Sequence, residues 1–389
     1  MKESTKFPVF EKMDSNICCG CEACSSACPK KIITFHEDAI GFRFPDFESE
    51  RCIKCYKCVE VCPQLTEIAD RVEIRECYGG YALDNDLVLK SSSGGIYSCI
   101  VDWFKCKFPD GMFIGVVWTD DYKATEFIIT SDMNELNRIR VSKYIQARKN
   151  HIYQKVKSAL DASTTVLFTG CPCEVAALKS YLKNDYDNLY TVDMVCKGST
   201  SEKVMREYID MISKGNRILD LNLRAVGKRP WIPQWIKIVF VGGRELLMPF
   251  YSTPLGKAFH LLQRDACYSC KFCGKNRFSD LTLGDFHGAD PNRKYYNPDG
   301  TSEIIINTIR GRMIVNGIAA MCVLEPVEYD EIAAHNPRVE HSWDKDPKRD
   351  RFAHTLAECG LTAAYREYVP LKSRIKITIL TLLYKMWRR

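Results

Sequence analysis

Two runs of cysteines near the N-terminus limit the fold of this chain more than any other feature. Each run has the spacing C-x2-C-x2-C-x3-C-P, and the members are Cys18, Cys21, Cys24 and Cys28, then Cys52, Cys55, Cys58 and Cys62. Three cysteines on a tight loop reach three corners of a [4Fe–4S] cluster, and the fourth cysteine of each run serves the other cluster. The spacing therefore predicts a first cluster on Cys18, Cys21, Cys24 and Cys62 and a second on Cys52, Cys55, Cys58 and Cys28.

A zinc site is the alternative interpretation of these cysteines. Zinc usually takes four ligands from C-x2-C pairs, whereas each triplet here has a distant fourth member. The stretch between the runs, KIITFHEDAIGFRFPDF, predicts two short strands around a turn. This arrangement is typical of a small bacterial-type two-cluster ferredoxin domain. Cys19 lies between two of the predicted ligands and is assigned no role.

Cysteine is also the outlier of the composition, with 20 residues among 389. So many thiols suit either an oxidising compartment with disulfides or a reducing one with metal clusters. The N-terminal stretch MKESTKFPVFEKMDSN has no apolar core of signal-peptide length, so a cytoplasmic location is expected. The net charge of +6 is mild and does not by itself argue for or against nucleic acid, and no nucleic-acid partner is predicted.

The C-terminal tail has the strongest apolar character of any segment near a terminus. Its run Ile375 to Tyr384 is shorter than the roughly 20 residues of a membrane span, and lysines and arginines flank it on both sides. We expect the tail to dock as a helix on its own protein, or else to contact an anionic membrane surface or a partner.

Downstream of the ferredoxin run, strands and helices alternate. The segments TVLFTG and LYTVDMVC read as strands, and PCEVAALKSYL and SEKVMREYIDMISK read as helices. This βαβα order predicts parallel strands joined by right-handed crossovers. Beyond about Asn222 the strands come in pairs, among them SDLTLGDF and EIIINTI, which indicates a more antiparallel part.

Four further cysteines are placed to form a third group. Cys173 lies in the first turn of a predicted helix, behind Pro172, and just after a strand. Cys196 ends the next strand, so both thiols belong at the carboxyl edge of a sheet, where open α/β sheets bind ligands. Cys267 and Cys270 add a C-x2-C pair. Four thiolates are enough for a third [4Fe–4S] cluster, and from spacing alone zinc and unrelated core cysteines remain the alternatives.

Several motifs of this region resemble the coenzyme F420 hydrogenase/dehydrogenase beta-subunit family in order and spacing. They are SSSGG, SKYIQA, VLFTGCPCEVAAL, LYTVDMVCKG, CYSCKF and RFSDLTLGDFHG. With the ferredoxin run in front, the resemblance covers Cys18 to beyond Gly288. It implies an iron–sulfur flavoprotein that passes electrons between clusters, a bound flavin and a substrate such as a deazaflavin.

The resemblance also carries roles to individual residues. The third-cluster ligands that it implies are Cys173, Cys196, Cys267 and Cys270. The departures from the family pattern are Cys171 for Thr, Glu174 for Gln, Lys197 for His, His287 for Trp, and the extra thiol of Cys273. Because these departures gather at the predicted site, a substrate other than the deazaflavin remains open.

A flavin, FAD or FMN, is the cofactor that the resemblance adds. It places the flavin beside a Ser/Gly turn that precedes a helix and offers N–H groups and hydroxyls to a phosphate. The predicted flavin-binding residues are Ser92, Ser93, Gly94, Gly95, Lys143, Tyr144, Thr169 and Gly170. Simpler interpretations stand beside these, namely an ordinary helix start, a surface lysine and a packed tyrosine.

His287 and Lys197 are the candidate proton donors, and the alternative for His287 is simple packing. Asp280 and Asp285 are interpreted either as structural carboxylates or as polar groups of the pocket. No GxGxxG or P-loop pattern occurs, which disfavours a separate nicotinamide domain.

The predicted fold class is α/β (α+β), with a ferredoxin domain followed by a mixed α/β flavin and iron–sulfur domain whose C-terminal portion is partly antiparallel. The expected divisions are 1–70 for the ferredoxin domain, 71–165 for the flavin-binding part, 166–340 for the part with the third cluster, and 341–389 for the basic helical tail.

The leading hypothesis is an oxidoreductase that draws electrons from ferredoxin or a similar donor through [4Fe–4S] clusters to a flavin and an organic acceptor. The expected partners are a redox protein, such as ferredoxin or a dehydrogenase or hydrogenase subunit, and a small-molecule substrate. The competing hypothesis is an electron-transfer subunit whose partner performs the chemistry. A zinc-binding scaffold is the weakest of the three.

Overall fold

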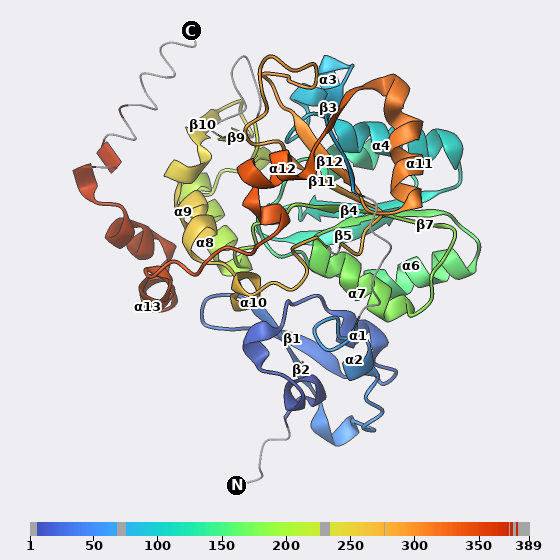
Figure 1. Cartoon of the computed structure of the whole chain (residues 1–389). Helices are drawn as coiled ribbons and strands as arrows, with labels where there is room; N and C mark the ends of the chain where they lie inside the picture. The colour runs from blue at the N-terminus through green and yellow to red at the C-terminus, as the bar shows by residue number, and fades with distance from the viewer. Residues whose placement is uncertain are drawn as a thin grey trace.

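The computed structural model describes residues 6–67, 75–225, 234–275, 277–372, 374, 375 and 379. A small N-terminal domain lies at one end of a larger α/β body (Figure 1). In the described part of the chain, no helix combines the length and the apolar character that crossing a bilayer requires.

The N-terminal domain contains one local structure twice. Its elements are η1 (Pro8–Glu11), η2 (Ser15–Ile17), α1 (Ala23–Ala27), β1 (Ile33–Glu37), β2 (Arg43–Phe47), η3 (Ser49–Arg51) and α2 (Lys57–Glu60). The residue after the second cysteine of each run has a left-handed backbone, with φ 61° at Glu22 and 56° at Tyr56, and a short helix follows each. The repeated cysteine spacing thus produces a repeated loop, and β1 and β2 form the predicted antiparallel hairpin between the two copies.

The body is built on one mixed sheet of eight strands. These are β3 (Glu76–Ala82), β4 (Met112–Trp118), β5 (Thr125–Thr130), β6 (Val166–Gly170), β7 (Leu189–Met194), β11 (Leu281–Asp285), β12 (Ser302–Ile306) and β13 (Cys322–Val327). Their order is β13-β3-β12-β11-β7-β6-β4-β5. The central strands β4, β6, β7 and β11 are mutually parallel, and the outer neighbours pair antiparallel. The carboxyl ends of four strands therefore meet at one edge.

Helices cover both faces of this sheet. On one face lie α4 (Ile96–Lys107) and α11 (Ile309–Ile318), whose apolar side chains share a core with β4 and β12. On the other face lie α6 (Ile152–Asp161) and α7 (Pro172–Leu182). The core on this second face also contains Cys21, Ala23 and Val61, so the N-terminal domain packs against α6 and α7 as part of the same core.

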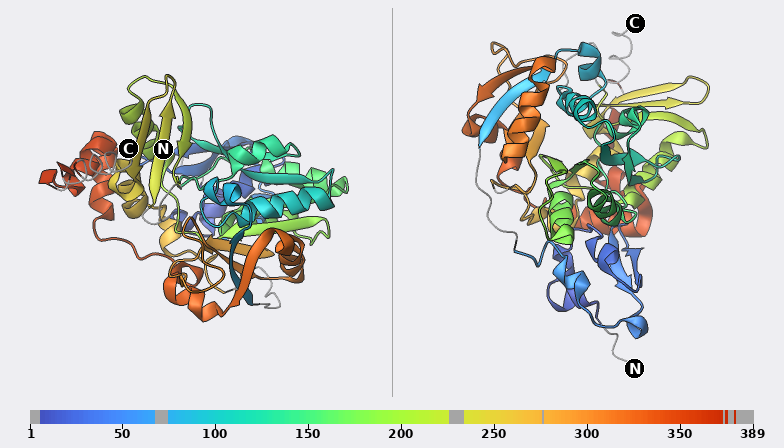
Figure 2. Two further views of the ribbon diagram at one scale, coloured as in Figure 1. Left: turned by 90° about the horizontal axis from the view of Figure 1, so that it is seen from above. Right: turned by 90° about the vertical axis from the view of Figure 1, so that its right-hand side faces the viewer.

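A second sheet projects from the body (Figure 2). It consists of the antiparallel strands β8 (Ile218–Asn222), β9 (Trp235–Phe240) and β10 (Glu245–Pro249), and α8 (Glu202–Ser213), α9 (Pro254–Leu261) and α13 (Arg349–Tyr368) complete its core. The connecting elements are α3 (Asn85–Leu89), η4 (Met133–Glu135), α5 (Leu136–Ile139), η5 (Phe250–Ser252), α10 (Asp265–Tyr268), η6 (Ala319–Met321), α12 (Tyr329–His335) and η7 (Pro337–Val339).

The mixed α/β class and the partly antiparallel C-terminal portion are confirmed, with one difference of detail. β11, expected in an antiparallel pair, also lies parallel to β7, because α9 and α10 return the chain to the main sheet before this strand. Strands from both sides of residue 165 share the main sheet, and the expected domain divisions stay a prediction. Most of the apolar tail run lies outside the described residues, so its predicted docking does too.

Candidate iron–sulfur and cofactor site

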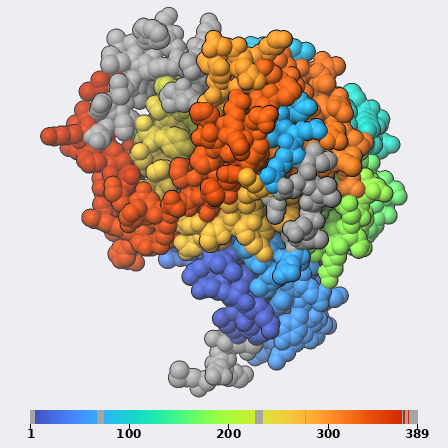
Figure 3. Space-filling model, viewed as in Figure 1, coloured from blue at the N-terminus to red at the C-terminus, as the bar shows by residue number. Residues whose placement is uncertain are grey.

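The four cysteines assigned to the second cluster line one cavity, here termed the second-cluster cavity. They are Cys28, Cys52, Cys55 and Cys58, and the other lining residues are mostly apolar, including Phe7, Ile32, Ile33, Phe47, Ile53 and Tyr56. Burial raises the pKa of the Cys58 thiol to about 11, whereas Cys55 is exposed. The domain that holds the cavity protrudes from the body (Figure 3). These residues fit a cluster with four thiolate ligands, apolar shielding and one side open to solvent.

The cysteines assigned to the first cluster lie within electrostatic reach of one another. Burial raises the pKa of Cys24, and the thiolates of Cys18 and Cys62 raise it further. Burial also raises the pKa of Cys62 to about 12. Contact with the Cys19 thiol, together with burial, raises the pKa of Cys21. Burial thus favours the neutral thiols, and a bound iron–sulfur cluster would supply the positive charge that allows them to bind as thiolates.

A mononuclear zinc site is the alternative for these thiols. Among the residues that the structure describes, no three His, Cys, Asp or Glu side chains are placed as ligands of one metal ion. A [4Fe–4S] cluster makes a different demand on the protein, because its four cysteines bind a cluster rather than one ion. The shared cavity and the mutual repulsion of the thiols are therefore the observations that bear on cluster binding.

The cysteines of the third group come together from three segments. Cys173 lies in the first turn of α7 at the end of β6, and Cys196 follows β7, the parallel neighbour of β6. Burial raises the pKa of Cys267 in α10 to about 12, and the thiolates of Cys196 and Cys270 add to that effect. The structure therefore places Cys173 and Cys196 at the same edge of the main sheet, as the sequence predicts.

Three further thiols contact these predicted ligands. Cys171 contacts Cys196, and Cys273 contacts Cys270. Cys19, to which the sequence assigns no role, contacts both Cys173 in the body and Cys21 in the N-terminal domain. Its main-chain neighbour Cys18 is a predicted ligand of the first cluster, so one dipeptide connects the first and third thiol groups.

Gln146 and Arg264 enclose that dipeptide. Gln146 donates from Nε2 to the carbonyls of Cys19 and Gly20 at 2.8 and 3.0 Å. Arg264 donates from Nε to the carbonyl of Cys18 and from Nη1 to Gln146 Oε1. Gly20 has φ 65°, and a Cβ there would lie 2.2 Å from Gln146 Nε2, so this close approach requires glycine. The contact zone formed by Cys18, Cys19, Cys173, Gln146 and Arg264 is termed the domain junction.

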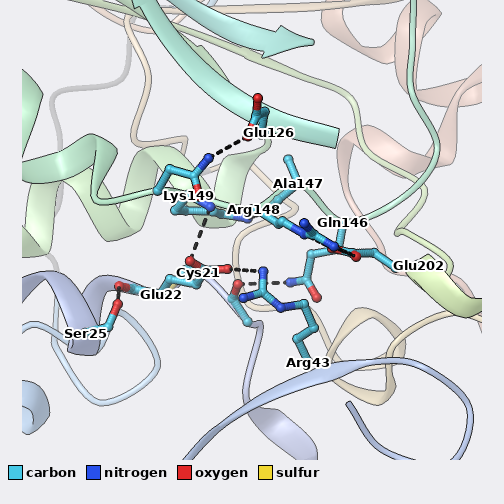
Figure 4. A network of polar contacts seen from close by, with 12 residues as sticks. Cys21, Glu22, Ser25, Arg43, Glu126, Gln146, Ala147, Arg148, Lys149 and Glu202 are labelled. Carbon is cyan, nitrogen blue, oxygen red and sulfur yellow. Dashed lines mark hydrogen bonds and ion pairs between the residues drawn. The ribbon is translucent and has the colours of Figure 1, made fainter. Parts of the chain in front are cut away.

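A buried charge network lies next to the domain junction (Figure 4). Lys149 is 1% exposed, and its Nζ lies 2.8 Å from Glu174 Oε1. Glu22 of the N-terminal domain accepts a hydrogen bond from the Lys149 backbone N–H and pairs with Arg43 at 2.8 Å. Burial lowers the pKa of Lys149, but the Glu174 and Glu22 carboxylates outweigh it and raise that pKa overall. Glu174, one of the departures from the family pattern, therefore helps to join the two domains through Lys149.

The predicted flavin turn is held between two segments of the body. Ser93 Oγ donates to the Thr301 carbonyl at 2.8 Å, and the Gly94 N–H donates to Ser302 Oγ at 3.0 Å. Ser92 Oγ accepts from the Ser142 N–H at 2.8 Å. Gly95, with φ 81°, caps α4, and a Cβ on Gly94 would lie 2.6 Å from a backbone oxygen. The turn is rigid, and three of its polar groups already have protein partners.

Buried polar atoms with spare hydrogen-bonding capacity lie near this turn. Thr169 Oγ1 at the end of β6 and the Tyr97 hydroxyl in the first turn of α4 are buried and contact each other, and Arg140 Nε after α5 is buried and has no hydrogen-bond partner among the described residues. Burial raises the pKa of Tyr97 to about 12. Buried polar atoms are normally satisfied, so these atoms are candidate contacts for a ligand with polar edges.

Lys143 and Tyr144 make contacts within the protein and do not have the positions that the predicted phosphate and ring contacts require. Lys143 Nζ donates to the carbonyls of Ile139, Arg140 and Val141 at 3.0–3.3 Å, and burial lowers its pKa to about 7. The Tyr144 ring packs 4.4 Å from the Phe259 ring, centroid to centroid. The structure thus brings Thr169 into contact with Tyr97, which follows the Ser/Gly turn, whereas Lys143 faces backbone carbonyls.

The candidate proton donors follow two neighbouring parallel strands, β7 and β11. Lys197 Nζ lies 3.4 Å from His260 Nδ1 and 4.7–5.3 Å from the centroids of the Trp343, Tyr251 and Phe259 rings. Burial and the charge of Arg338 lower its pKa to about 8. Burial also lowers the pKa of half-buried His287, while the charge of Asp285 acts in the opposite direction. Sequence patterns carry no signal for the aromatic surroundings of Lys197, because these rings come from distant segments.

The two aspartates of the SDLTLGDF strand have different surroundings. Asp280 accepts hydrogen bonds from Thr191 and Thr308 and is structural. Asp285 lies 2.5 Å from Arg224, a buried residue that also donates to the Ser92 carbonyl at 2.7 Å. The Arg224–Asp285 pair therefore connects the flavin turn to the His287 segment, which sequence reasoning missed.

Comparison with known proteins now adds to this geometry. Residues 17–65 match the 4Fe-4S dicluster domain, and residues 163–332 match the family described as the C terminus of the coenzyme F420 hydrogenase/dehydrogenase beta subunit. A solved structure of the F420-reducing [NiFe] hydrogenase complex from Methanosarcina barkeri aligns with a TM-score of 0.47 at 16% identity, over 77% of this chain and 92% of that chain.

Three curated relatives are similar over most of the chain. The coenzyme F420-dependent sulfite reductase of Methanocaldococcus jannaschii is 24% identical over 91% of this chain, which spans 54% of that relative's length. The F subunit of the F420H2 dehydrogenase of Methanosarcina mazei is 22% identical, over 77% of this chain and 82% of the relative. The beta subunit of the coenzyme F420 hydrogenase of Methanococcus voltae is 21% identical, over 73% and 95%.

The matched regions coincide with the thiol groups of the structure. The dicluster match contains both cysteine quartets, and the beta-subunit match contains β6, β7, β11 and the third group of cysteines. The relatives are oxidoreductases or their subunits by name, which is consistent with an iron–sulfur electron-transfer protein. The chain therefore combines a 4Fe-4S dicluster domain at residues 17–65 with a domain at residues 163–332 that matches the C terminus of the coenzyme F420 hydrogenase/dehydrogenase beta subunit.

Proposed function

We propose that this chain is an iron–sulfur flavoprotein oxidoreductase. It takes electrons from a ferredoxin-like donor at the second-cluster cavity and delivers them to an organic acceptor at the carboxyl edge of the main sheet. When bound, the clusters supply one-electron transfer and a flavin supplies the conversion to two-electron chemistry. A cytoplasmic location suits these thiols, because cluster ligands must stay reduced.

The observation that carries this proposal is the continuous arrangement of thiols. Cys55 is exposed at the cavity, the quartets share the N-terminal domain, and Cys19 contacts Cys173 at the domain junction. Cys196 and Lys197 then follow the same strand, so the third thiol group adjoins the candidate proton donors. Electrons taken up at the exposed end therefore have thiol ligands along the way to the acceptor site.

The buried polar atoms of Thr169, Tyr97 and Arg140, whose hydrogen-bonding capacity is not filled, support a flavin beside the Ser/Gly turn. In this proposal Ser92, Ser93, Gly94 and Gly95 hold the cofactor through the helix N-terminus, and Thr169 and Gly170 face it. Tyr144 supports the pocket wall from the aromatic cluster, and Lys143 fixes the 139–143 segment through its carbonyl contacts.

Lys197 is the proposed proton donor, with His287 as the second candidate. Because burial lowers the pKa of Lys197 to about 8, its amine carries a proton below that pH and loses it above. We expect the turnover rate to fall as pH rises through about 8, and Lys197→Met to remove this limb of the pH–rate profile. An unchanged profile in Lys197→Met would assign the proton to another group.

Anaerobic purification with quantification of iron, sulfide and released flavin tests the proposal as a whole. About twelve irons and one flavin per chain are expected. About eight irons without flavin would reduce the protein to an electron carrier, and zinc alone would overturn the proposal. Thr169→Val, which removes the buried hydroxyl with little change in volume, should lower flavin occupancy without changing iron content.

A second candidate is a subunit that carries electrons for a catalytic partner. The names of two relatives favour it, since one is a dehydrogenase subunit and the other a hydrogenase subunit. Size-exclusion chromatography of the protein purified from its own cells distinguishes the two candidates. A stable complex that alone reduces an acceptor supports the subunit, whereas turnover by the isolated chain supports the enzyme.

A further inference from the structure

Arg264 differs from the other buried arginines of the described structure. Arg224, Arg277 and Arg349 each lie within 4.0 Å of a carboxylate, namely Asp285, Asp193 and Asp265. Arg264 is 1% exposed, and no carboxylate ion pair is formed with it among the described residues. A buried charge is costly unless an opposite charge compensates it, so the surroundings of Arg264 should contain an anion.

The oxygen atoms that accept hydrogen bonds from Arg264 all belong to neutral groups, and the guanidinium also contacts the Cys18 thiol. Nε donates to the Cys18 carbonyl, and Nη1 donates to the Arg43 carbonyl and to Gln146 Oε1, each at 3.0 Å. Nη2 is buried and has no partner among the described residues. The guanidinium also lies 4.2 Å from the centroid of the Phe44 ring. Carbonyls and a ring face spread the charge but do not neutralise it.

Three thiols lie within electrostatic reach of this guanidinium. Burial raises the pKa values of Cys18 and Cys267, and contacts with Cys173 and Cys21 lower that of Cys19; the charge of Arg264 acts to lower all three. Cys18 is a predicted ligand of the first cluster and Cys267 of the third. Arg264 therefore lies between two thiol groups that belong to different domains.

We propose that Arg264 is the shared counter-charge of the first and third clusters and raises the reduction potential of both above that of the second. This inference rests on the proposed function, because it requires clusters at both thiol groups. A [4Fe–4S] cluster with four thiolates is an anion and gains one more negative charge when it accepts an electron. A buried cation nearby stabilises that reduced form, and local charge is one of the factors that set cluster potentials.

The direction of electron flow follows from this placement. Arg264 is a buried cation of the domain junction, whereas the cations that line the second-cluster cavity are the solvent-exposed Lys30 and Lys54. Exposed charges are screened by water and salt, so they act on a cluster more weakly than a buried charge does. An electron that arrives at the second cluster would thus move to lower free energy at the junction.

Potentiometric titration followed by EPR on the anaerobic full-length protein tests the proposal. Arg264→Gln removes the charge, and Arg264→Lys keeps it. Gln146→Glu places a carboxylate against Arg264 Nη1 without removing the arginine. Arg349→Gln is the matched control, because it removes a buried arginine that already pairs with Asp265. The signal lost in Cys58→Ser identifies the second cluster.

We expect Arg264→Gln and Gln146→Glu to lower the reduction potentials of the first and third clusters. The electron-transfer equilibrium constant of each should change at least tenfold, which corresponds to about 59 mV for one electron. Arg264→Lys and Arg349→Gln should change the same equilibrium constants less than threefold. The reduction potential of the second cluster should stay unchanged in all four variants. Full iron content with unchanged potentials in Arg264→Gln and Gln146→Glu would overturn the proposal, as would an equal shift in Arg264→Lys. If Arg264→Gln fails to fold, Gln146→Glu decides. Wild-type protein without clusters would instead refute the proposed function.

Discussion

The second-cluster cavity and the domain junction hold their thiols in opposite surroundings. The cavity is lined mainly by apolar side chains, and its cysteines include the exposed Cys55. The junction is buried and is enclosed by Arg264, Gln146 and, next to them, the Lys149 network. An exposed apolar rim suits brief contact with a partner, whereas a buried charged centre suits a fixed contact between domains. In the proposed function, the exposed end of the thiol series exchanges electrons with a partner, and the buried end is a fixed contact between the two domains.

Loss of individual ligands should separate the two regions most clearly. Cys58→Ser should lower the iron content from about twelve to about eight per chain and leave the third cluster intact. Cys267→Ser should cause an equal loss but keep the N-terminal clusters. Iron analysis with EPR of each reduced variant measures this. Loss of all the iron in both variants would mean that the groups do not assemble independently.

The buried network should control how firmly the domains are joined. Lys149→Met leaves Glu174 buried without its cation and should lower the free energy of unfolding by about 3–5 kcal/mol. The exposed inter-domain pair Lys183–Glu60 is the control, and Lys183→Met should give no measurable change. Denaturant unfolding under anaerobic conditions compares the two variants, and equal effects would contradict the distinction between buried and exposed contacts.

Cys19 should affect the rate of transfer across the junction rather than cluster content. Cys19→Ala removes the thiol that contacts Cys173 and Cys21, and we expect about tenfold slower reduction of the third cluster with unchanged iron. Rapid-freeze EPR after mixing with a reductant measures this rate, and Cys106→Ala, at an exposed thiol on α4, is the control. Iron loss in Cys19→Ala would make this residue a ligand instead.

The smallest effect is expected at the cavity rim. Lys30 and Lys54 line the cavity, and no acidic side chain does. Lys54→Glu should raise the KM for an acidic ferredoxin a few-fold at low salt, with the difference vanishing at high salt. Lys214→Glu, after α8, provides a control for net charge. Equal effects of both substitutions would mean that the donor does not dock at the cavity.

The sequence was most informative where chemistry is local. The C-x2-C-x2-C spacing predicts the paired loops with Glu22 and Tyr56, because ligand spacing and loop geometry are fixed within a few residues. The common edge of Cys173 and Cys196 follows from the βαβ order. Arg264, Gln146 and Lys149 could not be predicted in this way, because their partners lie more than a hundred residues away in the chain or carry no periodic pattern. Contacts between domains depend on how two folded surfaces meet, which local patterns do not record.

Glu22 and Tyr56 occupy equivalent places in the two halves of the N-terminal domain, yet their environments differ. Glu22 is 8% exposed and holds Arg43 and Lys149, whereas the Tyr56 ring is 42% exposed beside the cavity. A symmetric two-cluster unit could bind the body through either half, and its conducting direction would then be ambiguous. This difference makes the two halves of the N-terminal domain unequal: at Glu22 the domain packs against the body, and at Tyr56 it faces solvent. Exchanging the side chains of Glu22 and Tyr56 would therefore test whether the other half of the domain then packs against the body.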